Sequence, residues 1–176
     1  MTTQLQTDEP ALNDRTHAPN IRSLTPLDDA AIAAVIRAVS AQYGLTADKG
    51  YGVADKTLDT LSVVYQANNA HYWVIEYQGS ICGGAGIAPL AGHSKVCELQ
   101  KMYFMPAIRG LGMAKRLSAQ AIDFAKKSGY SSIYLETTAV LVEALALYQK
   151  LGFVPCEHLG ETGHDACEIA MRLELD

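Results

Sequence analysis

The sequence predicts one α/β domain, and three features support that class. Short apolar runs of strand-like composition are separated by longer segments in which apolar residues recur at helical spacing. The chain has 176 residues, of which 49% are hydrophobic, which is enough for one full core. It contains no internal repeat. We therefore expect a single domain over residues 20–176, preceded by a loose, polar leader at residues 1–19.

The domain is expected to begin with a strand and a helix. Asn20–Leu24 has the composition of a short strand. A helix should open at Pro26 and end at Gly44, because proline favours the first helical turn and glycine often follows the last. Its apolar positions are Ile32, Val35, Ile36 and Val39. A weaker helix is expected at Thr57–Tyr65.

Two strands joined by a tight turn should follow. His71–Tyr77 and Ser80–Ile87 have strand composition, and Gln78-Gly79 between them predicts a hairpin. The second strand contains glycine at positions 83, 84 and 86. Glycine inside a strand indicates a bulge or a group packed close against the backbone.

The second half of the chain alternates between strands and helices. Strands are expected at Glu98–Phe104, Ser131–Thr137, Phe153–Pro155 and Ala166–Leu175, and helices at Met113–Lys127 and Ala139–Leu151. The first of these helices has one apolar face and ends at Ser128-Gly129, a helix-terminating pair. The second is mostly apolar, so it should be largely buried. The last strand alternates apolar residues from Cys167 to Leu175.

The connection between the strand at Glu98–Phe104 and the next helix has the composition of an anion site. The strand stops at Pro106, and the helix begins directly after Arg109-Gly-Leu-Gly112. Glycines allow a tight turn, and the free N–H groups of a helix's first turn attract anions. Arg109 adds a forked cation suited to phosphate oxygens. Because the dinucleotide fingerprint and the P-loop signature are both absent, an ordinary strand-to-helix turn is the alternative.

Two motifs in this half carry a family resemblance. The segment Arg109-Gly-Leu-Gly-Met-Ala114 is similar to an acyl-CoA signature, R/Q-x-x-G-x-G/A. Further along, Leu147-Tyr-Gln-Lys-Leu-Gly-Phe153 is similar to the motif L-Y-x-K-x-G-F. In this order and at this separation, the two segments resemble the GNAT superfamily of acyl-CoA-dependent N-acetyltransferases. The likeness extends over about residues 20–175.

The resemblance implies a fold and a substrate site. The fold would be a central mixed, mostly antiparallel sheet of six to seven strands, flanked by about four helices, with splayed central strands at the acyl-CoA site. The splayed strand at Met102, Tyr103 and Phe104 would pair its backbone with the pantetheine arm. The pyrophosphate would lie on a short run: Arg109, Gly110, Leu111, Gly112, Met113 and Ala114. The loop at residues 43–55 would help to shape the acceptor pocket.

The resemblance also assigns catalytic candidates. Tyr148 occupies the tyrosine position of the second motif, where family members use the phenol as general acid toward the CoA sulfur; a purely packed tyrosine is the alternative. Glu98 and Glu136 are competing candidates for the general base, and water chains alone would also serve. One departure from the family pattern is Leu141, where an asparagine often contacts pantetheine. Thr137 or Thr138 would be a substitute for that contact.

Other classes of partner and site are disfavoured. A net charge of −5 argues against nucleic acid, and no apolar run approaches the length of a membrane span. The four cysteines form no C-x-x-C pair, and the polar start carries no secretory pattern, so a reduced, cytoplasmic protein is expected. Four residues near the end of the chain carry side chains that could ligate zinc: Cys156, His158, His164 and Cys167. Their spacing fits no standard zinc signature, so no metal is expected.

The resemblance therefore implies an enzyme that transfers an acetyl group from acetyl-CoA to a primary amine by direct attack in a ternary complex. The acceptor is a small-molecule or peptide amine, and an acidic chain would suit a cationic one. A non-catalytic acyl-CoA-binding sensor and an acyltransferase with another acyl donor are the alternatives. The apolar last strand is compatible with a homodimer.

Overall fold

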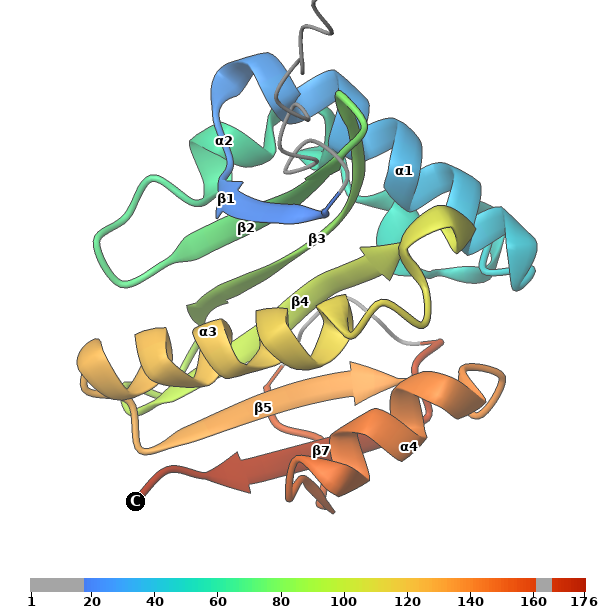
Figure 1. The fold of residues 1–176 in the computed structure, drawn as a ribbon. Coiled ribbons are helices and arrows are strands. Elements are labelled where there is room, and N and C mark those ends of the chain that lie inside the picture. Colours follow the sequence, from blue (N-terminus) through green and yellow to red (C-terminus); the bar gives the residue numbers. More distant parts are fainter. Residues whose placement is uncertain (1–17, 161–165) are drawn as a thin grey trace, which may run out of the picture.

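The computed structural model describes residues 18–160 and 166–176, so most of the expected leader lies outside the described residues. One seven-stranded sheet organises the fold (Figure 1). Its strands, in spatial order, are β1 (Asn20–Ser23), β2 (His71–Tyr77), β3 (Ser80–Pro89), β4 (Val96–Phe104), β5 (Ser132–Thr137), β7 (Ile169–Glu174) and β6 (Val154–Pro155). Only β4 and β5 pair in parallel; the other neighbours are antiparallel. The expected mixed, mostly antiparallel sheet is confirmed.

Four α-helices in the described part of the chain cover the two faces of this sheet. In Figure 1, α3 (Met113–Lys127) and α4 (Val142–Lys150) lie in front of it, and α1 (Asp29–Gln42) and α2 (Leu61–Val64) lie behind its upper half. The α3 side holds the larger apolar core, with Leu117, Ile133 and Met171 nearly inaccessible. A second core lies between α1, α2 and β2.

Two expectations about helices are wrong. Thr57–Tyr65 is not one helix, but a 3₁₀ turn at Leu58–Thr60 followed by the single turn of α2. The helix α4 is not largely buried: Tyr148 is its buried residue, and Val142 is 65% exposed. The physical reason is that part of its apolar face borders a cavity rather than the packed core.

The central strands β4 and β5 diverge about halfway along their length. Pairing between β4 and β5 joins Val96–Glu98 to Ser132–Tyr134 and ends there. Beyond this point β4 carries a bulge, because its register against β3 shifts between Gly84 and Gly86 and Lys101 has a φ of +50°. The Tyr72 hydroxyl donates to the Lys101 carbonyl over 2.9 Å and so supports this backbone. A bulge bends and twists its strand, which accounts for the splay.

The glycines of β3 make room for two aromatic rings. A Cβ added at Gly86 would lie 2.6 Å from ring atoms of both Tyr65 and Tyr72, and one at Gly84 would lie 2.6 Å from the Tyr72 ring. Real Cβ atoms do not approach other groups so closely. Both readings of the glycine pattern are thus confirmed, since the strand faces a bulge and carries rings packed on its backbone.

Within the described ranges, no helix combines the length and the apolar composition that crossing a membrane requires.

Candidate active site

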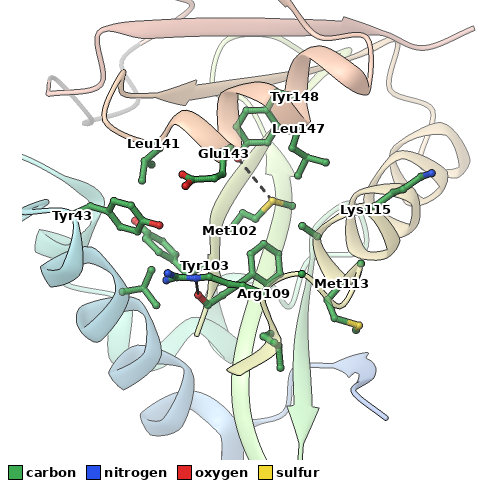
Figure 2. A pocket seen from close by; sticks show the side chains of 17 residues that line it. Tyr43, Met102, Tyr103, Arg109, Met113, Lys115, Leu141, Glu143, Leu147 and Tyr148 are labelled. Atoms are coloured by element: carbon green, nitrogen blue, oxygen red, sulfur yellow. Dashed lines mark hydrogen bonds between the residues drawn. The ribbon is translucent and has the colours of Figure 1, made fainter. Parts of the chain in front are cut away.

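A cavity of about 600 Å³ opens where β4 and β5 diverge (Figure 2). Its wall comes from the end of β4, the glycine loop, the first turn of α3, the inner face of α4 and the end of α1. The residues that line it include Tyr43, Met102, Tyr103, Phe104, Arg109, Gly112, Leu141 and Tyr148. Residues far apart in the sequence therefore meet at one place, including both motifs of the family resemblance.

The glycine loop presents a helix N-terminus to this cavity. Gly110 and Gly112 have φ values of +75° and +74°, a conformation that other residues rarely adopt. Gly112 is also the N-cap residue of α3 and has no side chain to bond the first turn. The N–H groups of that turn have no partner within the helix. Met113 and Ala114, which provide two of these groups, line the cavity.

Arg109 lies in the cavity wall, and its side chain is held by neighbouring elements. Its Nε donates to the Phe104 carbonyl over 2.9 Å, and its Nη2 donates to Gln42 Oε1 over 2.8 Å. Its guanidinium carbon also lies 5.7 Å from the centre of the Tyr43 ring. Arg109 thus connects the glycine loop to the end of α1, in addition to placing a cation beside the loop.

Tyr148 projects from α4 toward β4. Its side chain is buried, and its hydroxyl lies 3.8 Å from Met102 Sδ (Figure 2). A thioether is a weak acceptor, so the hydroxyl is directed to the splayed strand without a strong competing bond. Burial raises the pKa of Tyr148 above its ordinary value. The phenol therefore holds its proton at neutral pH and can donate it inside the cavity.

Glu98 lies on β4 but does not line this cavity. It is 4% exposed, and its Oε2 accepts a hydrogen bond of 2.6 Å from Gln100 Nε2. Gln100 in turn accepts a bond of 2.7 Å from the hydroxyl of Tyr65, at the end of α2. Glu98 therefore faces the α2 side of the sheet, while Tyr148 approaches from the α4 side.

Glu136 is held by a different set of groups on β5. The Tyr134 hydroxyl donates to Glu136 Oε1 over 2.6 Å, and His158 Nδ1 lies 3.4 Å from the same oxygen. Tyr134 also accepts a bond from the backbone N–H of Leu159. The Glu136 side chain is 4% exposed and, like Glu98, lies outside the cavity lining. Its contacts tie β5 to the segment that follows β6.

The remaining predicted positions are the candidates for a pantetheine contact and the residues considered as zinc ligands. Leu141 lines the cavity, whereas Thr138 donates to Glu168 over 3.1 Å and Thr137 is buried. His164, one of the four residues considered for zinc, lies outside the described residues. In residues 18–160 and 166–176, no three His, Cys, Asp or Glu side chains are grouped as a metal site would need.

Sequence reasoning missed several cavity residues. Tyr43 directly follows α1, and Glu143 and Leu147 come from α4 (Figure 2). The second motif could have indicated both α4 residues, because Leu147 belongs to it and Glu143 lies four positions earlier on the same helix face. Tyr43 begins the loop at residues 43–55, which was expected to shape the acceptor pocket, but no individual role was predicted for it. The sequence also gave no indication of Tyr65 and Gln100, because the hydrogen bonds from Tyr65 to Gln100 and from Gln100 to Glu98 depend on long-range packing.

Comparison with known sequences gives a family match. The chain matches a family model described as Acetyltransferase (GNAT) family over residues 34–153. It is 57% identical over 160 residues to a protein named Uncharacterized N-acetyltransferase YjgM from Escherichia coli (strain K12), covering 90% of this chain and 96% of that one. The N-acetylaspartate synthetase of Xenopus tropicalis is 38% identical over 95 residues, which are 53% of this chain and 33% of that protein.

Comparison with solved structures gives the same fold. An acetyltransferase of the GNAT family from Staphylococcus aureus Mu50 superposes with a TM-score of 0.79 at 19% identity, covering 90% of this chain and all of that one. The Salmonella typhimurium protein yncA, solved with its cofactor acetyl-CoA, superposes with a TM-score of 0.69 at 21% identity, covering 90% of this chain and 94% of that one. At these identities the likeness concerns the fold.

Proposed function

The chain belongs to the GNAT acetyltransferase family, and we propose that it transfers an acetyl group from acetyl-CoA directly to a primary amine while both substrates are bound. The observation that carries the proposal is the position of Tyr148. A buried phenol, directed at the splayed strand from the opposite cavity wall, is suited to meet a leaving sulfur there.

The residues around the cavity fit acetyl-CoA. The backbone of β4 from Met102 to Phe104 is released from β5 and can pair with the amide groups of a pantetheine arm. The N–H groups of the loop from Arg109 to Ala114 suit a pyrophosphate, and the positive end of α3 adds to the attraction. The mainly apolar cavity wall would exclude water from the thioester.

Bound acetyl-CoA would supply an acetyl thioester whose C–S bond breaks as the C–N bond to the amine forms. The acceptor ammonium ion must lose two protons in this exchange. Glu98 takes the first, which frees the nitrogen lone pair for attack. Tyr148 gives its hydroxyl proton to the departing thiolate, and the second proton from the nitrogen restores the phenol. No covalent acetyl-enzyme is required.

Glu98 is favoured over Glu136 as the base because of what surrounds each carboxylate. Glu136 is engaged by Tyr134 and lies beside His158, and this network also bonds the backbone of Leu159. Glu98 is hydrogen-bonded too, so the two carboxylates differ in position: Glu136 joins β5 to the segment after β6, whereas Glu98 lies where β4 begins to diverge from β5. Glu98 lies on the splayed strand itself, two residues before Gln100 and on the face away from Tyr148. The amine would then approach from the α2 side and the acyl-CoA from the α4 side.

The acceptor class remains broad. A cationic amine suits the net charge of −5, whereas the name of the Xenopus tropicalis relative points to an amino acid acceptor. This chain spans about a third of that relative, so its substrate is one member of a test panel. We propose spermidine, L-lysine, L-aspartate and a lysine-containing peptide as the first panel.

The test is Tyr148→Phe, assayed by release of free CoA and by calorimetric binding of acetyl-CoA. Loss of the hydroxyl should lower kcat about 10²-fold while leaving the acetyl-CoA affinity nearly unchanged. Gln149→Ala, an exposed change at the next position of α4, is the matched control and should retain activity. Equal rates for wild type and Tyr148→Phe would remove the phenol from the mechanism.

The alternative is a non-catalytic acyl-CoA-binding module. Tight acetyl-CoA binding without transfer to any panel amine would favour that alternative. We also propose a cytoplasmic location, which the four unpaired cysteines support, and a homodimer. The apolar residues of β7 do not add support for the homodimer, because β7 lies between β5 and β6 and its Ala170 and Met171 are buried in the core.

A further inference from the structure

We propose that Tyr65 and Gln100 are positioning residues that hold the Glu98 carboxylate for proton transfer. The inference rests on the proposed function, in which Glu98 is the general base. Neither residue belongs to the motifs that identify the family, and neither lines the cavity between β4 and α4. Their contribution would come from a chain of two short hydrogen bonds that runs from α2 to β4.

The direction of these bonds follows from the chemistry of the groups. An ionised carboxylate can only accept, so Gln100 must present Nε2 to Glu98 Oε2 over their 2.6 Å contact. The amide oxygen of Gln100 then faces Tyr65. The Tyr65 hydroxyl must therefore donate across the 2.7 Å contact to Oε1. One orientation of the Gln100 amide satisfies both contacts, and Tyr65 selects that orientation.

Packing fixes the donor at the start of this chain. Tyr65 is 8% exposed, and its ring lies 5.1 Å from that of Tyr72, centre to centre. Gly86 provides the space, because a Cβ there would come within 2.6 Å of the Tyr65 ring. Burial, with a smaller contribution from the nearby Glu98 charge, raises the pKa of Tyr65, so its hydroxyl keeps the proton that it donates. The ring therefore occupies space that a glycine at position 86 leaves free.

The chain of hydrogen bonds from Tyr65 through Gln100 to Glu98, which we call the relay, would have two effects on Glu98. It would favour the ionised form, because a donated N–H stabilises a buried carboxylate, and it would fix the direction in which that carboxylate faces. Other titratable groups around this region come from several elements: Asp55 from the loop after α1, Lys101 and Tyr103 from β4, Glu136 from β5, and Cys167 and Glu168 from the segment before β7.

The first experiment measures the titration of Glu98 without any need for turnover. Carboxyl ¹³C NMR of the full chain, with Glu98→Gln to assign the signal, would follow the carboxylate in wild type and variants. Gln100→Met should raise the pKa of Glu98 by about one pH unit, a tenfold change in proton affinity. Tyr65→Phe should move it in the same direction by less. Unchanged titration in Gln100→Met would overturn the relay.

Tyr130→Phe is the matched control. Tyr130 is also 8% exposed and also donates its hydroxyl over a short contact, 2.8 Å, but to the Asn69 carbonyl away from Glu98. This change removes a buried hydroxyl at a similar cost in stability. It should leave the Glu98 titration where it is in wild type. A shift of equal size in Tyr130→Phe would mean that the variants act through general loosening.

The second experiment uses the pH dependence of kcat/KM with acetyl-CoA and the best amine of the panel. Because the relay favours the ionised base, Tyr65→Phe and Gln100→Met should move the acidic limb to higher pH and lower kcat about tenfold, with acetyl-CoA affinity kept. The double variant should be no worse than Gln100→Met alone, since both changes break one chain. Wild-type rates in Glu98→Gln would defeat the base assignment. If Glu98→Gln were inactive but the acidic limb of the pH profile did not move in Gln100→Met, the relay would be refuted while the base assignment would stand.

Discussion

Glycines at the two ends of α3 allow the effect of backbone strain to be separated from the effect on ligand binding. Gly112 precedes the helix with a φ of +74°, and Gly129 follows it with a φ of +79°. A Cβ at either position would have no atom within 4 Å. Gly112→Ala and Gly129→Ala should therefore each cost about 1–2 kcal/mol of folding free energy, through backbone strain alone.

A negative charge should distinguish the two ends. If the pyrophosphate of acetyl-CoA lies at Gly112, a carboxylate introduced there would be about 4 Å from a phosphate charge. At an effective dielectric constant of about 20, that repulsion is about 4 kcal/mol. This corresponds to an increase of about 10³-fold in Kd at low ionic strength, and to less at high salt. Gly129→Asp should leave the affinity within about twofold of wild type, because it lies at the far end of the helix.

Isothermal calorimetry gives Kd, and urea unfolding gives the stability of each variant. The expected pattern is similar stability for both alanine variants, together with a selective loss of binding in Gly112→Asp. If Gly112→Asp bound acetyl-CoA as tightly as Gly129→Asp, the loop would be only a turn. The assignment of Arg109–Ala114 to the pyrophosphate would then be abandoned.

Two further predictions concern the scaffold. Gly86→Ala would drive a Cβ into the Tyr65 and Tyr72 rings and should lower the free energy of unfolding in urea by about 3 kcal/mol. Gly92→Ala, in open space, should lower it by only about 1 kcal/mol. Equal losses in the two variants would argue against the tight ring packing. Asp28 accepts two bonds from Arg22, and these hold the pKa of Asp28 well below its usual range, so they contribute stability above about pH 4 that is lost as pH falls further. Asp28→Asn should therefore cost about 3 kcal/mol at pH 7, and the gap to wild type should narrow toward pH 2; a gap independent of pH would contradict this linkage.

The sequence predicted the elements whose signals are local. The helix at Met113–Lys127 has a regular apolar face and clear ends, and its predicted bounds are those of α3. The hairpin of β2 and β3 was marked by its turn, although β3 extends to Pro89. The segment at Thr57–Tyr65 failed because its apolar residues are held by packing on α1 rather than by helical spacing.

The candidate site was predictable only in part, for the same reason. The glycine loop and Tyr148 belong to motifs, so their positions could be named in advance, and the structure brings them to one cavity. The link from Tyr65 through Gln100 to Glu98 joins residues 35 positions apart and depends on how α2 lies on the sheet. The role of Arg109 in bonding Gln42 likewise needs the end of α1 beside the loop.

The most direct test of the proposed activity is to incubate the wild-type chain with acetyl-CoA and each panel amine, measuring free CoA and identifying the product by mass spectrometry. We expect at least one amine to accelerate CoA release and to yield its N-acetyl derivative in equal amount. Tight binding of acetyl-CoA with no acetylated product from any amine would contradict the enzyme assignment and leave a binding module in its place.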